Sequence, residues 1–226
     1  LPDLGQPIGF SQIAPAAVVL VGIAVTGWLT SLMIRPLAPA DPSRPLPANP
    51  VLETARGLRQ LAATRPLLRT ALGIAFFWFL ASLANMNIDA FGSSELALAQ
   101  EKIGLLLGTL VIGLGFGSVL AGYLSGDKIE LGLVPIGAGG IAISSLMLCF
   151  AGNGVDPTDA TTQIHAYYVA SLWLFLLGAS AGFFNVPLEA FLQQRSDLKH
   201  RGTILAASNF VSFSLMLFSS GLFYVM

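Results

Sequence analysis

Six long apolar stretches, separated by short polar segments, constrain the fold of this chain more than any other feature. Each holds about 20 residues or more, and an α-helix of that length crosses the ~30 Å hydrocarbon core of a bilayer. Charged residues make up only 10% of the chain, against about 25% in soluble domains. We therefore predict an all-α, polytopic membrane protein with six transmembrane helices. The predicted spans are 13–34, 67–88, 103–125, 131–151, 166–193 and 203–226.

The connection between the first two spans divides into two parts. Six of the residues in 35–50 are proline, which favours an extended linker over a helix. In 51–64 apolar residues recur at helical spacing, while Arg56 and Arg59 fall elsewhere on the helical wheel. This second part is too short to span a bilayer, so we predict an amphipathic helix at the membrane surface.

Basic residues alternate from one side of the predicted bundle to the other. Ten of the 11 lysines and arginines lie between spans one and two, three and four, or five and six, and only Lys102 lies on the opposite side. Cytoplasmic loops carry the excess of basic residues. We therefore expect Arg44 and Lys199 to be cytoplasmic and Asp156 to be external. The net charge of −1 offers no global field for nucleic acid.

Patterns typical of enzymes and cofactor sites do not fit this chain. The single cysteine, Cys149, excludes a CxxC metal site, and there is no phosphate-binding G-x4-G-K-[ST] motif. The G-x-S-x-G pattern from Gly178 to Gly182 lies within a span and not at a strand-to-helix turn, so it indicates close helix packing. We expect no catalytic residue, no metal and no cofactor. Because the chain starts at Leu1 and ends inside an apolar stretch, we expect a fragment of a longer protein.

Polar residues inside the fifth span are the strongest sign of function. Asn185 and Glu189 lie one turn apart, and polar groups at membrane depth usually face a protein interior or a cavity. Pro187 removes one helical hydrogen bond and predicts a kink. We expect Phe183, Asn185 and Glu189 to line a substrate pathway. The alternative is that Glu189 forms a salt bridge with Arg195 or Arg201 at the cytoplasmic rim.

Three further polar residues extend this hypothesis. Asn85 and Asp89 are i,i+4 neighbours near the outer end of the second span and could form an outer gate or simply a solvated helix end. Asn87 points elsewhere on the wheel. Asn209 lies about two turns into the sixth span, where a hydrogen bond between helices is the simplest role. We include Asn85, Asp89 and Asn209 in the predicted pathway.

Glycines of the third span recur at steps of four and seven residues, which brings them near one helix face. Such a face allows a neighbouring helix to approach closely. It could serve static packing, or sliding between two halves of a transporter. We predict that this face packs against another helix. Its members are Gly104, Gly108, Gly115, Gly122 and Gly126.

These features together resemble the carboxy-terminal half of a major facilitator superfamily transporter. The turn GYLSGDK, from Gly122 to Lys128, resembles the superfamily's cytoplasmic G-x-x-x-D-[RK] motif, with Asp127 one position late. The resemblance implies that 1–34 is the last helix of the amino-terminal half, 35–66 the cytoplasmic linker, and 67–226 an incomplete carboxy-terminal half. It also implies a cytoplasmic gate. Its motif residues would be Gly122, Asp127 and Lys128. Glu189 lies four residues from the inner end of the fifth span, so we expect it to join this gate together with Arg195 or Arg201.

Two stretches resemble the bacterial lysophospholipid transporter group: GYLSGDKIELGLVPIGAGG, and GFFNVPLEAFLQQR with the RGTILAASNF that follows it. The resemblance implies alternating-access movement of lysophospholipid, chiefly lysophosphatidylethanolamine, across the bacterial inner membrane. The implied partners are the bilayer, a lysophospholipid or another amphipathic small molecule, and a fused or co-encoded acyltransferase. One alternative is a superfamily exporter of drugs or small metabolites. Another is a membrane anchor for a fused acyltransferase.

Overall fold

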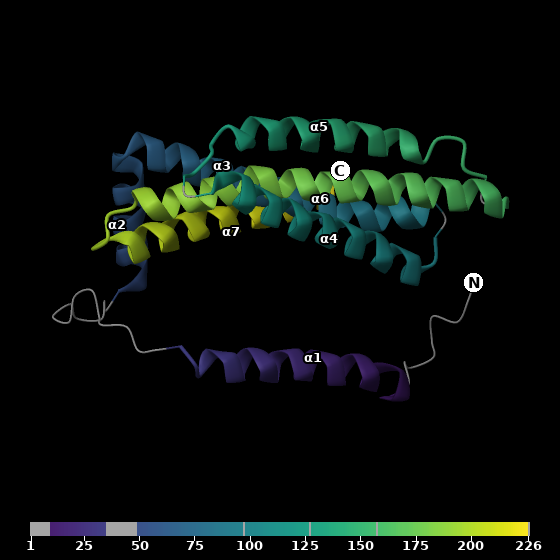
Figure 1. Ribbon diagram of the computed structural model, residues 1–226, viewed down its shortest axis with the longest axis horizontal. Helices are drawn as coiled ribbons and strands as arrows, with labels where there is room; N and C mark the ends of the chain where they lie inside the picture. Colours follow the sequence, from purple (N-terminus) through teal and green to yellow (C-terminus); the bar gives the residue numbers. More distant parts are fainter. Residues whose placement is uncertain (1–9, 35–48, 97, 127, 157, 226) are drawn as a thin grey trace. The chain divides into compact units, whose positions relative to one another are not determined.

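The computed structural model describes residues 10–34, 49–96, 98–126, 128–156 and 158–225. These residues form helices joined by turns, which confirms the predicted all-α class. The chain divides into two units, Leu1–Arg44 and Pro45–Met226, and each is described by itself. The first unit contains one helix, α1 (Phe10–Ser31). In the second unit, α3 to α7 run side by side as long helices (Figure 1). Its helices are α2 (Pro50–Ala63), α3 (Arg65–Ser94), α4 (Gln100–Ser125), α5 (Leu133–Ala151), α6 (Ala160–Arg195) and α7 (Arg201–Val225).

Five of the described helices, α3 to α7, are long and apolar enough to cross a membrane. The first predicted span, 13–34, is helical as α1, but its apolar part within the described residues, Ala17–Ser31, is shorter than the other five. The predicted count of six is therefore approximate. The predicted linker 35–50 lies almost entirely outside the described residues, and so does Asp127 of the predicted gate.

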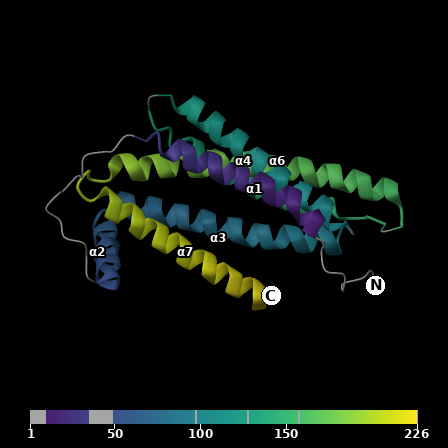
Figure 2. The ribbon, with the colours of Figure 1, turned by 90° about the horizontal axis from the view of Figure 1, so that it is seen from below.

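Helix α2 confirms the helix predicted between the linker and the second span. The side chain of Asn49 caps it, because Oδ1 accepts hydrogen bonds from the backbone nitrogens of Val51 and Leu52 at 3.0 and 3.2 Å. Gly57 faces α7, where a Cβ atom in its place would lie 3.1 Å from the side chain of Thr203. In Figure 2, α2 runs across the direction of α3 and α7. Its position at the membrane surface stays a prediction.

Helix α6 is the longest helix and packs against both α4 and α5. At Gly178 and Gly182 the backbone of α6 lies directly against the backbone of α4. A Cβ atom on either glycine would overlap α4 backbone atoms. On the α4 side, a Cβ atom on Gly113 or Gly117 would overlap the carbonyl oxygens of Phe175 and Ala179. Paired small residues that bring two helix backbones together are a common packing device in membranes. The packing interpretation of the Gly178–Gly182 motif is confirmed.

The predicted glycine face of α4 is wrong for the described part of the chain. Cβ atoms added to its glycines meet no atom there within 4 Å. An α-helix turns about 100° per residue, so Gly115 lies roughly 200° around α4 from both Gly113 and Gly117. The face that packs on α6 is therefore the opposite one. The open members are Gly104, Gly108, Gly115, Gly122 and Gly126.

Two clusters of buried apolar side chains hold the ends of α3. One contains Leu67, Ala71 and Ile74 near its start, together with residues of α2, α6 and α7. The other contains Ile88 near its end, together with residues of α4, α5 and α6. From Phe77 to its end at Ser94, α3 also contributes to the pockets described next.

Candidate functional site

A pocket of about 200 Å³ lies between α3, α6 and α7. We call it the Glu189 pocket. Glu189 comes from α6 and Asn209 from α7, so two residues predicted separately for the pathway share one lining. Trp78 comes from α3 and was not among the predicted site residues. The complete lining is Trp78, Glu189, Asn209, Ser212, Phe213 and Met216.

Glu189 is partly buried and faces this pocket, and no basic residue of the described ranges pairs with it. Among the described residues, its carboxylate forms no ion pair within 4 Å; the described pairs are Arg56–Glu53 and His200–Asp197. Arg195 is exposed, and its guanidinium lies 5.8 Å from the centre of the Phe191 ring. The predicted pairing of Glu189 with Arg195 or Arg201 is therefore absent from the described part of this structure, and the cytoplasmic gate stays a prediction.

Arg201 and Asn185 each have a buried polar atom that forms no hydrogen bond with the described residues. Nε of Arg201 and Oδ1 of Asn185 are both buried and have no hydrogen-bond partner within the described ranges. A buried polar group without a partner is costly. Such groups are candidates for hydrogen bonds to a substrate, to water, or to a segment of the protein that lies elsewhere.

The aromatic residues beside Asn185 connect α6 to its neighbours. Phe184 stacks on Phe77 of α3 with ring centres 6.0 Å apart. A Cβ atom on Gly137 of α5 would lie 2.6 Å from the backbone nitrogen of Phe184, so α5 also approaches closely here. Phe183 is partly buried. Pro187 is buried inside one continuous helix that runs to Arg195, and the kink predicted there stays a prediction.

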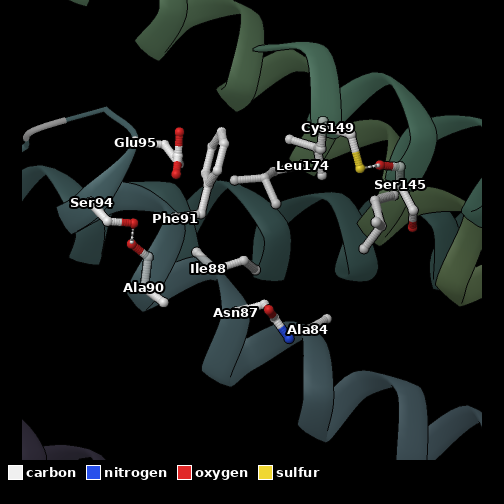
Figure 3. Close-up of a pocket in the computed structure, with 12 residues that line it drawn as sticks. Ala84, Asn87, Ile88, Ala90, Phe91, Ser94, Glu95, Ser145, Cys149 and Leu174 are labelled. Carbon is white, nitrogen blue, oxygen red and sulfur yellow. Dashed lines mark hydrogen bonds between the residues drawn. The ribbon is translucent and has the colours of Figure 1, made fainter. Parts of the chain in front are cut away.

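A larger pocket, of about 500 Å³, lies between α3, α5 and α6. We call it the Asn87 pocket. In Figure 3, Asn87 and Phe91 come from α3, Leu174 from α6, and Ser145 and Cys149 from α5. Its lining is mostly apolar, with Asn87, Ser94, Glu95 and Ser145 as the polar members.

The second-span residues chosen from the sequence lie beside this pocket but are not part of its lining. Asn85 and Asp89 are exposed, and Oδ1 of Asp89 accepts a hydrogen bond from Nε2 of Gln100 at 3.0 Å. That bond ties the end of α3 to the start of α4. Asn87, which the sequence placed on another face, lines the pocket instead. Ala84 and Phe91 at i−3 and i+4 are the signal that could have identified its face.

A third pocket, of about 270 Å³, extends between α3, α4, α5 and α6. Ser145 is the single hydroxyl-bearing residue among its lining residues, and the rest are apolar side chains and a glycine. We call it the apolar pocket. It shares Ala84, Ser145 and Leu177 with the Asn87 pocket, so the two linings are continuous.

The described residues of the predicted gate differ in exposure. Gly122 near the end of α4, Lys128 after it and Arg195 at the end of α6 are exposed, whereas Arg201 is partly buried. In the α6–α7 loop, Nδ1 of His200 lies 2.9 Å from Oδ2 of Asp197. This hydrogen bond, with a weaker contribution from the backbone N–H of Lys199, lowers the pKa of Asp197 below its usual value. Within the described ranges, no group of three or more His, Cys, Asp or Glu side chains could hold a metal ion.

The comparison with protein families decides the class of the protein. A model of the Major Facilitator Superfamily matches residues 8–220, from before α1 into α7. The chain belongs to the major facilitator superfamily. The family is one of multi-pass membrane transporters, and the five apolar helices agree with that class. No curated protein and no solved structure matches the chain.

Proposed function

We propose that this superfamily chain carries lysophospholipid, of the lysophosphatidylethanolamine type, across the bacterial inner membrane by alternating access. The observation that carries the proposal is the continuous lining of the apolar and Asn87 pockets along α3. Sites for small molecules typically measure ~300–1,000 Å³ and combine apolar walls with a few polar groups. The Asn87 pocket alone, at about 500 Å³, falls within this range.

A chain-like apolar substrate suits this lining better than a compact polar one. A sugar or a small polar metabolite requires several hydrogen-bonding side chains, because its polar groups lose water on binding. In the apolar pocket, Ser145 is the one described lining side chain that can form a hydrogen bond. The other polar and charged lining residues belong to the Asn87 and Glu189 pockets. An acyl chain beside a polar head group matches this separation of apolar and polar lining.

Transfer of labelled lysophosphatidylethanolamine by the full protein in proteoliposomes tests this function. We expect time-dependent transfer above that of empty liposomes. If lysophospholipid does not move while unrelated drugs or metabolites do, the protein is an exporter of the same superfamily. If nothing moves but an acyltransferase activity depends on this chain for membrane attachment, the chain is an anchor.

A further inference from the structure

We propose that the Glu189 pocket binds the ammonium group of the substrate, with Glu189 as its counter-ion. The inference rests on the proposed function, since it names the part of a zwitterionic lysophospholipid that this pocket holds. Neither the family match nor the resemblance assigns a ligand group to any of the six residues that line the pocket.

Glu189 is a carboxylate that the described part of the chain leaves without a counter-ion. Carboxylates within membrane helices are costly and normally pair with a cation or with hydrogen-bond donors. Glu189 faces the pocket with no ion-pair partner within 4 Å among the residues that the structure describes, although three basic residues follow it within 12 positions. A bound ammonium group would supply the missing positive charge and up to three N–H donors.

The other side chains that line the pocket also suit an ammonium group. Trp78 and Phe213 place two aromatic side chains at the pocket, and aromatic rings attract ammonium groups, tryptophan most strongly. Asn209 adds an amide carbonyl that can accept a hydrogen bond from N–H. The pocket contains no lysine or arginine, so its described lining disfavours the phosphate group of the same substrate.

The decisive comparison is between lysophosphatidylethanolamine and its N-acetyl derivative. The two share the acyl chain, the phosphate and the ethanolamine carbon atoms, but the derivative has no positive charge. Apparent affinities of the full protein are measured by competition for transport in proteoliposomes, and again by equilibrium binding without an ion gradient. The variants are Glu189→Gln, Glu189→Asp and Trp78→Leu, with Glu130→Gln as the control. Glu130 is an exposed carboxylate in the α4–α5 turn and belongs to none of the three pocket linings.

We expect wild-type protein to bind lysophosphatidylethanolamine more tightly than its N-acetyl derivative. Glu189→Gln should weaken its binding about tenfold or more, the effect of losing one charge-assisted contact, and leave the N-acetyl derivative unchanged. Trp78→Leu should weaken it by roughly threefold to thirtyfold. Glu189→Asp should keep part of the preference, and Glu130→Gln all of it. Thermal unfolding of each variant checks that it is folded.

Equal losses for both lipids in folded Glu189→Gln would overturn the inference, because a gate or a proton site acts on every substrate alike. No loss for either lipid would also overturn it. Wild-type protein that binds and moves no lysophospholipid would instead overturn the proposed function, and with it the lipid head group as the occupant. Preference for the charged lipid in wild type, abolished only by changes within the pocket, supports the assignment.

Discussion

Gly117 of α4 lies so close to Ala179 of α6 that a Cβ atom on Gly117 would overlap the carbonyl oxygen of Ala179. One helical turn earlier, Gly113 meets Phe175 in the same way. The two backbones touch over more than one turn, with Gly178 and Gly182 as the matching residues of α6. We call this contact, formed by Gly113, Gly117, Gly178 and Gly182, the seam. It sets the position of α6 along α4, and with it the position of Glu189.

A side chain at the seam should separate the two helices. We expect Gly117→Leu to lower the thermal stability of the detergent-solubilised full protein, because overpacking a close contact typically costs ~1–3 kcal/mol. Gly115→Leu is the matched control, since its Cβ atom meets nothing within 4 Å in the described part of the chain. Equal melting temperatures for both variants, or a larger loss for Gly115→Leu, would contradict the seam.

The alternation of basic loops predicts the orientation of the bundle. In a Cys149→Ala background, we expect Asp156→Cys to react with an impermeant maleimide added to intact cells. Lys199→Cys should react only after the membrane is permeabilised, because basic loops face the cytoplasm. Both positions are exposed in the structure, so poor access should not hide either result. Labelling of Lys199→Cys from outside would reverse the proposed orientation.

The α5–α6 loop contains a carboxylate whose pKa depends on one neighbour. Oδ1 of Asp156 accepts hydrogen bonds from the backbone nitrogen of Thr158 at 2.8 Å and from its Oγ1 at 2.7 Å, and these bonds lower the pKa of Asp156. The stability that they contribute is present above the ordinary carboxyl pKa and is lost as pH falls through the lowered value.

Thr158→Ala removes one of the two donors, so we expect the pKa of Asp156 to rise toward its ordinary value. Thr158→Ser keeps both donors and should keep the low pKa. A ¹³C NMR titration of the labelled aspartate carboxyl groups measures the shift. An unchanged pKa in Thr158→Ala would show that the Oγ1 hydrogen bond does not matter.

Filling the junction of the two continuous pockets should discriminate between acyl chains. Ala84 lines both the apolar pocket and the Asn87 pocket. We expect Ala84→Phe to reduce transport of long-chain lysophospholipids several times more than that of short-chain ones. Ile143→Phe, at an exposed position of α5, adds bulk outside the pockets and should affect both equally little. Equal inhibition of all chain lengths by Ala84→Phe would argue against an acyl chain at this junction.

Most helix positions could be predicted because hydropathy and length nearly determine a membrane span. The third span, predicted at 103–125, is α4 (Gln100–Ser125). The end of α3 was harder to predict. The second span was predicted to end at 88, but the helix continues to Ser94. Asn85, Asn87 and Asp89, at the end of the predicted span, lie inside the helix. The side chain of Asn87 donates a hydrogen bond to the backbone carbonyl oxygen of Leu83, and that of Ser93 donates one to the carbonyl oxygen of Asp89.

Which glycine face of α4 packs could not be predicted from spacing alone. Gly108 and Gly115 repeat every seven residues, but Gly113 and Gly117 repeat every four, and both patterns allow close approach. The packed face is the one that meets small residues on a neighbouring helix, and here these residues are Gly178 and Gly182 of α6.

The polar half of the Glu189 pocket could be predicted, and the aromatic half could not. Glu189 and Asn209 stand out because carboxylates and amides are rare in apolar helices. Trp78 and Phe213 do not stand out, since the chain has 15 phenylalanines and three tryptophans. Trp78 lies more than 100 positions before Glu189, so only the fold shows that the two share a pocket.

Occupancy of the Glu189 pocket by substrate can be measured directly by protection of a thiol placed in its lining. Asn209→Cys, in a Cys149→Ala background, places a reactive thiol at an exposed position of the pocket lining. Phe210→Cys, one residue on, is exposed but does not belong to that lining, and serves as the control. The measurement is the rate of alkylation of each thiol in membrane vesicles, with and without lysophosphatidylethanolamine. We predict that the lipid slows alkylation at position 209 severalfold and leaves position 210 unchanged. Equal rates at position 209 with and without lipid, at concentrations that saturate transport, would contradict the account.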